Sequence, residues 1–389
     1  MFKKLLIICP EFKDEFIRNQ PWRQIHELAK RLHKKNIHVA IATESTEKIN
    51  DSNIEILYLS QKHIRTLNPQ SMKKISNFSP DLILWIGNPY SGFYLKKLKI
   101  DIPIILYVSS MHMMYQELKN LSFIEIFSSH FLQLLTAFFP FKKIVKNLNT
   151  KKICKIIVAN ETIKNRLIEL NVNSNKILTS PLFFEMEETN QSTPSDNNSL
   201  FTICYFGPPD TIRGTDILLK SISLLKKKKI RVHLKLLLRE KNESVYKVFY
   251  SKCKKLGIEK NTNIVTKILS HHELMNQIQS CDVIVIPTKF VWNEPPLAIL
   301  ESMQLGLPLV TTNVCGLKEL VQNNAFTVDP TSNSLCDIFS KLISDPDLGK
   351  KIGMQGKKYV LSLSNWNDMT DWFLDELTKT WKKYNENQK

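Results

Sequence analysis

Short apolar runs alternate along the chain with longer stretches in which apolar residues recur at helical spacing. After the first run, for example, Trp22, Ile25, Leu28 and Leu32 fall on one face of a helix. The apolar runs of the first half are residues 5–9, 38–42, 54–59, 82–86, 104–108 and 156–159. Continuous apolar strands separated by helices are typical of a parallel sheet covered on both faces. The pattern therefore predicts a Rossmann-like α/β layout.

A polar stretch divides this pattern into two halves. Residues 187–199 (EETNQSTPSDNNS) have few apolar side chains and contain a proline, as linkers do. The alternation then restarts, with apolar runs at residues 201–206, 232–238, 264–265, 282–287 and 309–311. We therefore expect an N-terminal domain at residues 1–187, a linker at 188–199 and a C-terminal domain at 200–370. Two α/β domains place a cleft between them, and ligands bind at the carboxyl ends of such strands.

The composition is that of a folded protein with an unusual charge. The chain has 389 residues, which suits two domains, with 43% hydrophobic and 23% charged residues. Its seven cysteines form no CxxC pair, so a reducing, cytoplasmic compartment is expected. The first apolar run ends at Pro10-Glu11 without a cleavage site, which favours a buried strand over a signal sequence. The net charge of +17 predicts an anionic partner: nucleic acid, an acidic membrane surface or a phosphorylated substrate.

The segment with the most chemical information is residues 281–316 (CDVIVIPTKFVWNEPPLAILESMQLGLPLVTTNVCG). A buried strand leads into a loop and then into a helix, whose start is marked by Pro295-Pro296. Glu294 and Glu301 are seven residues apart, which returns two carboxylates to one face of a helix. There they could accept hydrogen bonds from sugar and ribose hydroxyls, while the helix amino end offers N–H groups to a diphosphate. The alternative is a solvated acidic helix start stabilised by the helix dipole.

The order of residues in this segment resembles a known family signature. Residues 301–310 (ESMQLGLPLV), the preceding strand at 281–288 and the turn at 316–319 (GLKE) resemble the retaining GT-B glycosyltransferases of family four, or glycosyl transferases group 1. The resemblance covers about residue 201 to the C-terminus. It implies two Rossmann-like domains with parallel sheets that face each other across a cleft, with a final helix, residues 371–389, returning to the first domain. It also implies hexosyl transfer from a nucleotide-sugar donor with retention of anomeric configuration.

The resemblance implies roles for the residues of the helix. Glu301 would bind the ribose, and Pro296 and Leu297 would stand at the amino end that receives the donor. The family's first glutamate lies eight residues before the second, where this chain has Asn293, with Glu294 one step later. Either residue could take the role. We favour Glu294, because a carboxylate is the stronger acceptor for sugar hydroxyls.

A second segment, residues 201–219 (FTICYFGPPDTIRGTDILL), has the strand–loop–helix outline of a phosphate site. The strand ends at Gly207, and Arg213-Gly214 resembles the lysine-glycine of the family's phosphate loop. Pro208 stands where the family has its first basic residue. Arg239, which ends another strand, could supply that missing contact, or it could merely terminate the strand. The resemblance makes Arg213 a catalytic candidate, because it would stabilise the leaving diphosphate.

The acceptor side carries fewer signals. The loop after the first strand, residues 11–21, has no glycine, and Ser180-Pro181 replaces the family's Asn-Gly. His112 follows the strand at 104–108 and is a candidate acceptor-side catalytic residue, although lone histidines are more often structural.

Residues 123–148 (FIEIFSSHFLQLLTAFFPFKKIVKNL) are rich in phenylalanine and leucine and lead into a run of lysines. They suit an interfacial element on an anionic membrane, extending to residue 152, which would place the protein at the inner face of the membrane beside a lipid-linked acceptor. The alternative is a core helix with a solvated basic end. The acceptor is then a lipid-linked molecule or a glycan.

Metal chemistry is not expected, because the two most suggestive patterns have simpler explanations. Asp345-Pro346-Asp347 reads as a helix N-cap, and His271-His272-Glu273 opens a helix without a second ligand pair. We therefore expect no metal and no cofactor besides the nucleotide-sugar substrate. Two other functions remain as alternatives: a nucleotide-sugar epimerase of the same fold, and a basic nucleic-acid-binding protein. The second lacks the aromatic-basic pattern of an RNA-recognition motif, so no nucleic-acid partner is expected.

Overall fold

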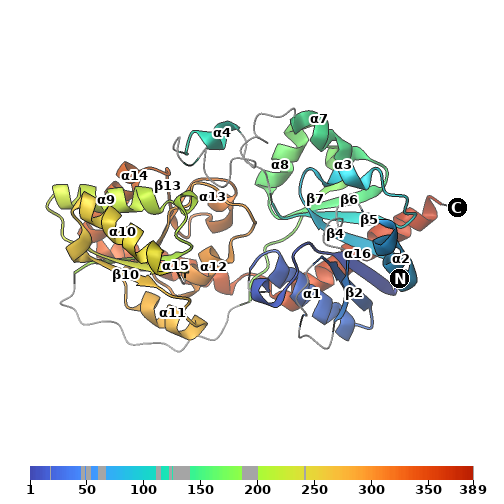
Figure 1. Cartoon of the computed structure of the whole chain (residues 1–389), viewed down its shortest axis with the longest axis horizontal. Helices are drawn as coiled ribbons and strands as arrows, with labels where there is room; N and C mark the ends of the chain where they lie inside the picture. The colour runs from blue at the N-terminus through green and yellow to red at the C-terminus, as the bar shows by residue number, and fades with distance from the viewer. Residues whose placement is uncertain are drawn as a thin grey trace.

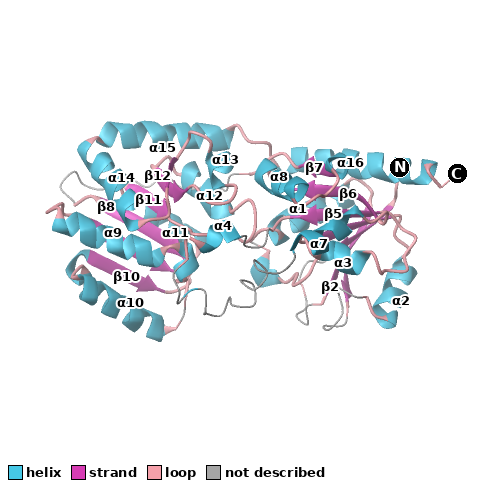
Figure 2. Cartoon of the chain, turned by 90° about the horizontal axis from the view of Figure 1, so that it is seen from above, coloured by secondary structure: helices cyan, strands magenta, loops and turns pink. Residues whose placement is uncertain are grey.

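The computed structural model describes residues 1–17, 19–44, 49, 54–59, 67–110, 115–121, 125, 141–185, 200–240 and 242–388. Within these residues the chain forms two parallel sheets, each flanked by helices, and together they make the long two-part molecule of Figures 1 and 2. The predicted fold class, GT-B with two Rossmann-like domains, is confirmed. The predicted linker lies outside the described residues.

The N-terminal sheet has the strand order β3-β2-β1-β4-β5-β6-β7, with every neighbouring pair parallel. Its strands are β1 (Lys4–Ile8), β2 (His38–Thr43), β3 (Glu55–Tyr58), β4 (Leu82–Gly87), β5 (Ile104–Val108), β6 (Ile153–Val158) and β7 (Ile177–Thr179). The described helices are α1 (Trp22–Lys34), α2 (Pro69–Phe78), α3 (Ser91–Leu95), α4 (Tyr115–Leu118), α7 (Phe141–Val145) and α8 (Glu161–Glu169).

Both faces of this sheet are buried, as its apolar strands require. In β1, Leu5 and Ile7 pack in one core cluster and Leu6 and Ile8 in another, because successive side chains of a strand point to opposite faces. All four side chains are fully buried. The first apolar run is therefore a buried strand, as predicted.

The C-terminal sheet has the order β10-β9-β8-β11-β12-β13 and is again parallel. Its strands are β8 (Thr202–Gly207), β9 (His233–Leu238), β10 (Thr262–Thr266), β11 (Val283–Ile286), β12 (Leu309–Thr312) and β13 (Phe326–Val328). Its helices are α9 (Thr215–Lys227), α10 (Glu243–Leu256), α11 (His271–Gln279), α12 (Leu297–Gln304), α13 (Leu317–Val321), α14 (Ser332–Ser344) and α15 (Pro346–Leu361). The sequence pattern missed the edge strands β7 and β13, which are three residues long.

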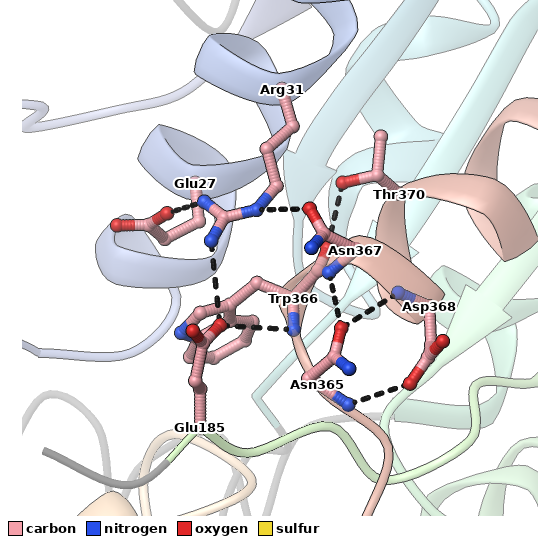
Figure 3. Close-up of polar contacts among 8 residues, drawn as sticks. All are labelled: Glu27, Arg31, Glu185, Asn365, Trp366, Asn367, Asp368 and Thr370. Atoms are coloured by element: carbon pink, nitrogen blue, oxygen red, sulfur yellow. Dashed lines mark hydrogen bonds and ion pairs between the residues drawn. The ribbon is translucent and has the colours of Figure 1, made fainter.

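The last helix, α16 (Trp366–Glu386), returns to the N-terminal domain, where Trp366, Met369, Phe373 and Leu377 join the core beside α1. Figure 3 shows how its first turn is fixed. Asn365 and Asp368 form a capping box, and Arg31 of α1 donates to Asn367 Oδ1 at 3.1 Å. The helix begins at Trp366, five residues before the predicted start at 371, because the capping box satisfies the free N–H groups of the first turn there.

Contacts between the domains start from the carboxyl edge of the N-terminal sheet. Ser109, which follows β5, accepts a hydrogen bond from the backbone N–H of Glu294 at 2.7 Å. Glu319 of α13 accepts from the N–H groups of Glu161 and Thr162, at 2.8 and 3.0 Å, and so satisfies the amino end of α8. Leu118 of α4 packs in one apolar cluster with Ile212 and Phe290 of the C-terminal domain.

Candidate functional site

Glu294 lies at the junction of the two domains rather than on a helix. Its backbone bonds to Ser109, and its side chain is 3% exposed. The helix α12 begins only at Leu297, with Pro296 as its N-cap. The predicted arrangement, with Glu294 and Glu301 on one helical face, is therefore wrong. The residue before a proline is biased toward extended backbone, so Pro295-Pro296 delays the helix.

The carboxylate of Glu294 is poorly satisfied. Its Oε1 accepts one hydrogen bond, from Gly316 N at 3.3 Å, and its Oε2 is buried with no partner among the described residues. Burial, with a smaller contribution from the nearby Glu319, raises the pKa of Glu294 to about 7, against the opposing effects of the Gly316 hydrogen bond and Arg166. This side chain therefore has an unused acceptor atom and a proton that exchanges near neutral pH. Asn293, the other candidate, is half-buried in the same loop.

A second unused acceptor lies at the same junction. Gln20 is 6% exposed, and its Oε1 is buried with no partner within the described part of the chain. Gln20 lines a small cavity with Gln24, Tyr107, Ser180 and Pro181 from the N-terminal domain and with Pro295 from the other. A wider hollow of about 510 Å³ surrounds β3 and the amino ends of β1 and β2, away from the ligand-binding edge, so we do not place the site there.

Glu301 stands on the second turn of α12 and faces the opposite domain. Its Oε1 lies 3.5 Å from Nη1 of Arg23, at the start of α1, and the two side chains are 24% and 14% exposed. The Arg23 guanidinium also lies over the Trp366 ring, 5.8 Å from its centroid. Arg23 escaped the sequence analysis because it is 278 residues from Glu301 and no local pattern links the two.

The amino end of α12 suits an anion. Its first turn contains no acidic residue, and Leu297 is buried while Pro296 is half-buried. The first N–H groups of a helix have no intrahelical acceptor and attract negative charge.

The loop after β8 packs against the end of β11, the strand that precedes α12 in the chain. At Gly214 φ is +75°, and a Cβ there would lie 1.8 Å from the carbonyl oxygen of Pro287, which follows β11. Only glycine permits this approach. Gly207, at the end of β8, has φ of +138°, and Tyr205 Oη donates to the carbonyl of Pro208 at 2.6 Å. These contacts fix the loop that carries the half-buried Arg213, the last residue of a 3₁₀ turn at Thr211–Arg213.

Arg239 also faces the other domain. It follows β9, is exposed, and its Nη1 donates to Asn19 Oδ1 at 3.4 Å. The structure thus puts Arg239 and Glu301 opposite the same short segment, residues 19–23. His112, the predicted acceptor-side residue, lies outside the described residues.

Lys289 forms a buried ion-pair network that the sequence did not reveal. It is 2% exposed, and its Nζ lies 2.8 Å from Glu125 Oε1 and 2.9 Å from Asp216 Oδ2. Glu125 comes from the segment predicted to bind membrane and is itself buried, so at this residue the membrane-facing interpretation is wrong. The sequence gives no sign of this network, because lysines are normally solvated and Glu125 lies 164 residues from Lys289 along the chain.

The discounted metal patterns have the predicted structures. Asp345 caps α15 by accepting from Leu348 N, and Ser270 and Glu273 form a capping box at the start of α11. Among the described residues, no group of three or more His, Cys, Asp or Glu side chains could hold a metal ion. Independence of metal stays a prediction. Within the same residues, no helix is long and apolar enough to cross a bilayer.

Comparisons with known proteins place these features in context. Residues 187–359 match the family described as glycosyl transferases group 1. A search of curated protein sequences found no match.

Solved structures with the same fold cover nearly the whole chain. A sucrose-phosphate synthase from Thermosynechococcus elongatus has a TM-score of 0.72 at 14% identity and covers 98% of this chain and 100% of its own. HepE of Anabaena, in complex with UDP and glucose, has a TM-score of 0.69 at 13% sequence identity, and the match covers 97% of this chain and 100% of HepE. WaaG, described as a glycosyltransferase involved in lipopolysaccharide biosynthesis, has a TM-score of 0.66 at 13% sequence identity, and the match covers 96% of this chain and 99% of WaaG.

Proposed function

We propose that the chain, whose residues 187–359 match glycosyl transferases group 1, transfers a hexose from a UDP-sugar to a glycan or lipid-linked acceptor with retention of anomeric configuration. The choice of UDP is supported by the similar fold of HepE, which was solved with UDP, with UDP and glucose, and with UDP-glucose.

The observation that carries the proposal is the pair of unused acceptor oxygens at the domain junction. Glu294 Oε2 and Gln20 Oε1 are both buried without a partner among the described residues, and each buried polar atom left unpaired costs free energy. Sugar hydroxyls are donors that satisfy such atoms. We therefore assign the donor sugar to this junction, with Glu294 as its principal acceptor.

We assign the ribose and the diphosphate of the donor to residues of α12 and its amino end. Glu301 accepts from the ribose hydroxyls, exchanging its 3.5 Å contact with Arg23 for shorter hydrogen bonds. The diphosphate lies at the amino end of α12, near Pro296 and Leu297, with the loop of Gly207 and Arg213 beside it.

The cationic groups supply the electrostatic part of catalysis. When the bond between the anomeric carbon and the diphosphate oxygen breaks, negative charge grows on that oxygen. Arg213, Arg239 and the helix N–H groups stabilise this charge. The leaving phosphate takes the acceptor's hydroxyl proton as the new bond forms on the same face, as the family resemblance implies. His112 remains the predicted acceptor-side group.

Product analysis tests the proposal. The protein is incubated with a panel of nucleotide-sugars and with lipid or glycan extracts, and the products are identified by mass spectrometry. We expect a glycosylated acceptor and free UDP, with full activity in excess EDTA. A sugar converted without any acceptor would indicate an epimerase instead, and loss of activity in EDTA with rescue by manganese would contradict the metal-free mechanism.

A matched pair of variants tests the sugar site. Gln20→Met removes one unused acceptor, so it should raise the KM for the donor sugar while leaving the affinity for UDP unchanged, because UDP has no sugar to bind there. Gln277→Met, at an exposed position on α11, is the control. Equal UDP-sugar kinetics in both variants would exclude Gln20 from the site.

A further inference from the structure

Two basic segments of the N-terminal domain are held together by close backbone packing. Gly92 of α3 lies against the turn that follows α7: a Cβ on Gly92 would stand 2.5 Å from Leu148 N and 2.6 Å from the carbonyl carbon of Asn147. Lys96 Nζ also donates to Asn147 Oδ1 at 2.8 Å. The two segments lie side by side in both views of the fold (Figures 1 and 2). The lysines that follow α3, Lys96 and Lys97, and those of α7 therefore share one region of the surface.

The two segments that form this region, residues 91–100 and 141–155, carry positive charges only. Residues 91–100 contain three lysines and residues 141–155 contain six, and neither range contains an aspartate or glutamate. Asp101, which follows the first range, accepts a hydrogen bond from Tyr384 of α16 at 2.7 Å. We define the lysine surface as the exposed residues Phe93, Lys96, Lys97, Lys142, Lys143 and Lys146.

An exposed aromatic ring lies among these lysines. Phe93 is 42% exposed, and the ammonium groups of Lys97 and Lys96 lie 4.5 and 5.3 Å from the centre of its ring. Exposed phenylalanine is unfavourable in water but suits the boundary between headgroups and acyl chains. A ring with several lysines around it thus combines the two attractions that hold a protein to an acidic bilayer.

We propose that the lysine surface docks on an anionic lipid membrane, with Phe93 entering the headgroup region. The α3 helix begins four residues after the carboxyl end of β4, so the surface borders the edge at which the N-terminal sheet meets its ligands. Docking there brings that edge to the bilayer. The inference extends the proposed function, because it presents a lipid-linked acceptor to the cleft. It shares Lys142, Lys143 and Lys146 with the segment predicted from the sequence, residues 123–152, and adds Phe93, Lys96 and Lys97 beside α3.

Another exposed aromatic region provides the control. On α10, Tyr246 and Tyr250 stack in the open at 40% and 44% exposure, with Lys247, Lys254 and Lys255 also exposed. There, however, Glu243 precedes the aromatic pair and Glu259 follows the lysines. Removing three lysines from α10 changes the net charge as much as removing three from the lysine surface.

Flotation with lipid vesicles tests the proposal on the full chain. Vesicles of phosphatidylcholine with phosphatidylglycerol are compared with vesicles of phosphatidylcholine alone. The triple variant Lys97→Gln, Lys142→Gln, Lys143→Gln should bind the acidic vesicles roughly a hundredfold more weakly, since each lysine near the surface contributes roughly fivefold. Phe93→Ala should weaken binding by several-fold, and Phe93→Trp should restore it. The α10 triple variant Lys247→Gln, Lys254→Gln, Lys255→Gln should bind as the wild type does.

The proposal fails if the wild type does not bind acidic vesicles at low salt, or if the α10 variant loses as much vesicle binding as the lysine-surface variant. It also fails if inorganic phosphate at matched ionic strength competes fully with the vesicles, or if these lysines bind nucleic acid but not vesicles. UDP release from the donor in the absence of vesicles is measured on every variant. If that reaction is intact while vesicle binding is absent, only the membrane inference fails. If it is absent from the wild type, the proposed function fails separately.

Discussion

The two domains meet through two kinds of contact, one beside Lys289 and one beside Glu301. Lys289 is buried and bonds to two carboxylates at 2.8 and 2.9 Å, one from each domain. Glu301 and Arg239 contact the segment 19–23 at 3.5 and 3.4 Å, with side chains that are partly exposed. The first network has short contacts around two buried side chains, Lys289 and Glu125, with Asp216 partly exposed. The contacts of the second are longer, and none of its side chains is fully buried.

The difference separates a structural contact from an exchangeable one. A partly exposed ion pair contributes little free energy, so a ligand displaces it at small cost. A buried ion pair contributes little when complete but is costly to break, because the remaining charge has no water around it. The Lys289 network therefore serves as a structural link between the domains, while the Arg23–Glu301 pair orders Glu301, the proposed ribose-binding residue, at a contact that a ligand could replace.

The largest effect is expected at Lys289. Lys289→Met removes the buried cation that faces Glu125 and Asp216 and should reduce the free energy of unfolding by about 3–5 kcal/mol. Urea denaturation measures this loss. Lys228→Met, which breaks the exposed pair with Asp337, is the matched control and should cost less than about 1 kcal/mol. The double variant Lys289→Met, Glu125→Met should recover much of the loss. Equal stability of Lys289→Met and the wild type would remove the distinction between the two kinds of contact.

Glu294 should make stability depend on pH. Its folded pKa of about 7 exceeds the unfolded value near 4.5, so only the folded state holds the proton between these values. The contribution to stability is complete below about pH 4.5, declines as the pH rises toward 7, and is absent above that. The full amplitude is on the order of 3 kcal/mol.

The variant Glu294→Gln tests this assignment, because glutamine does not titrate. It should lose the slope between pH 4.5 and 7 and be more stable than the wild type at pH 8, while transferring sugar more slowly. Unfolding curves at several pH values provide the measurement. A slope that survives in the variant would assign the titration to another group.

The sequence predicted the fold well because the evidence for it is local. Each long strand is a continuous apolar run, and the linker is a polar stretch, so the parallel two-domain layout could be derived without contacts. The short strands β7 and β13 were missed because three residues, most of them half-buried, make no recognisable run. The helix α12 was started too early because two consecutive prolines mark a boundary without saying on which side it lies.

The candidate site could be predicted only where one segment carries it. Glu301, the glycines of the phosphate loop and the start of α12 belong to continuous motifs. Arg23 and Lys289 bond to side chains of the other domain, and Gln20 shares a cavity with Pro295 of the other domain. Nothing in their own sequence neighbourhoods marks them. Sequence reasoning also assumes that lysine is exposed, which is correct on average and wrong for Lys289.

Glu301 should dominate nucleotide affinity. Glu301→Gln replaces a charged hydrogen-bond acceptor with a neutral one, which costs about 1.5–3 kcal/mol and weakens UDP binding roughly ten- to a hundredfold. Calorimetry with UDP gives the affinity, and circular dichroism verifies folding. Glu273→Gln, at the exposed start of α11, should bind UDP normally. A folded Glu301→Gln protein with unchanged affinity would place the ribose elsewhere.

The smallest effect, and the most direct test of exchangeability, concerns the Arg23–Glu301 pair. A double-mutant cycle with Arg23→Gln and Glu301→Gln isolates the coupling between the two side chains from every other effect of either change. Without ligand, the coupling should be about 0.2–1 kcal/mol, as for other partly exposed pairs. In saturating UDP it should fall to nearly zero, because the ribose hydroxyls then occupy Glu301. The same cycle on Lys228 and Asp337, an exposed pair remote from α12, should give one value with and without UDP. A coupling between Arg23 and Glu301 that persists in saturating UDP would mean that the pair is structural, like Lys289, and that the ribose does not replace it.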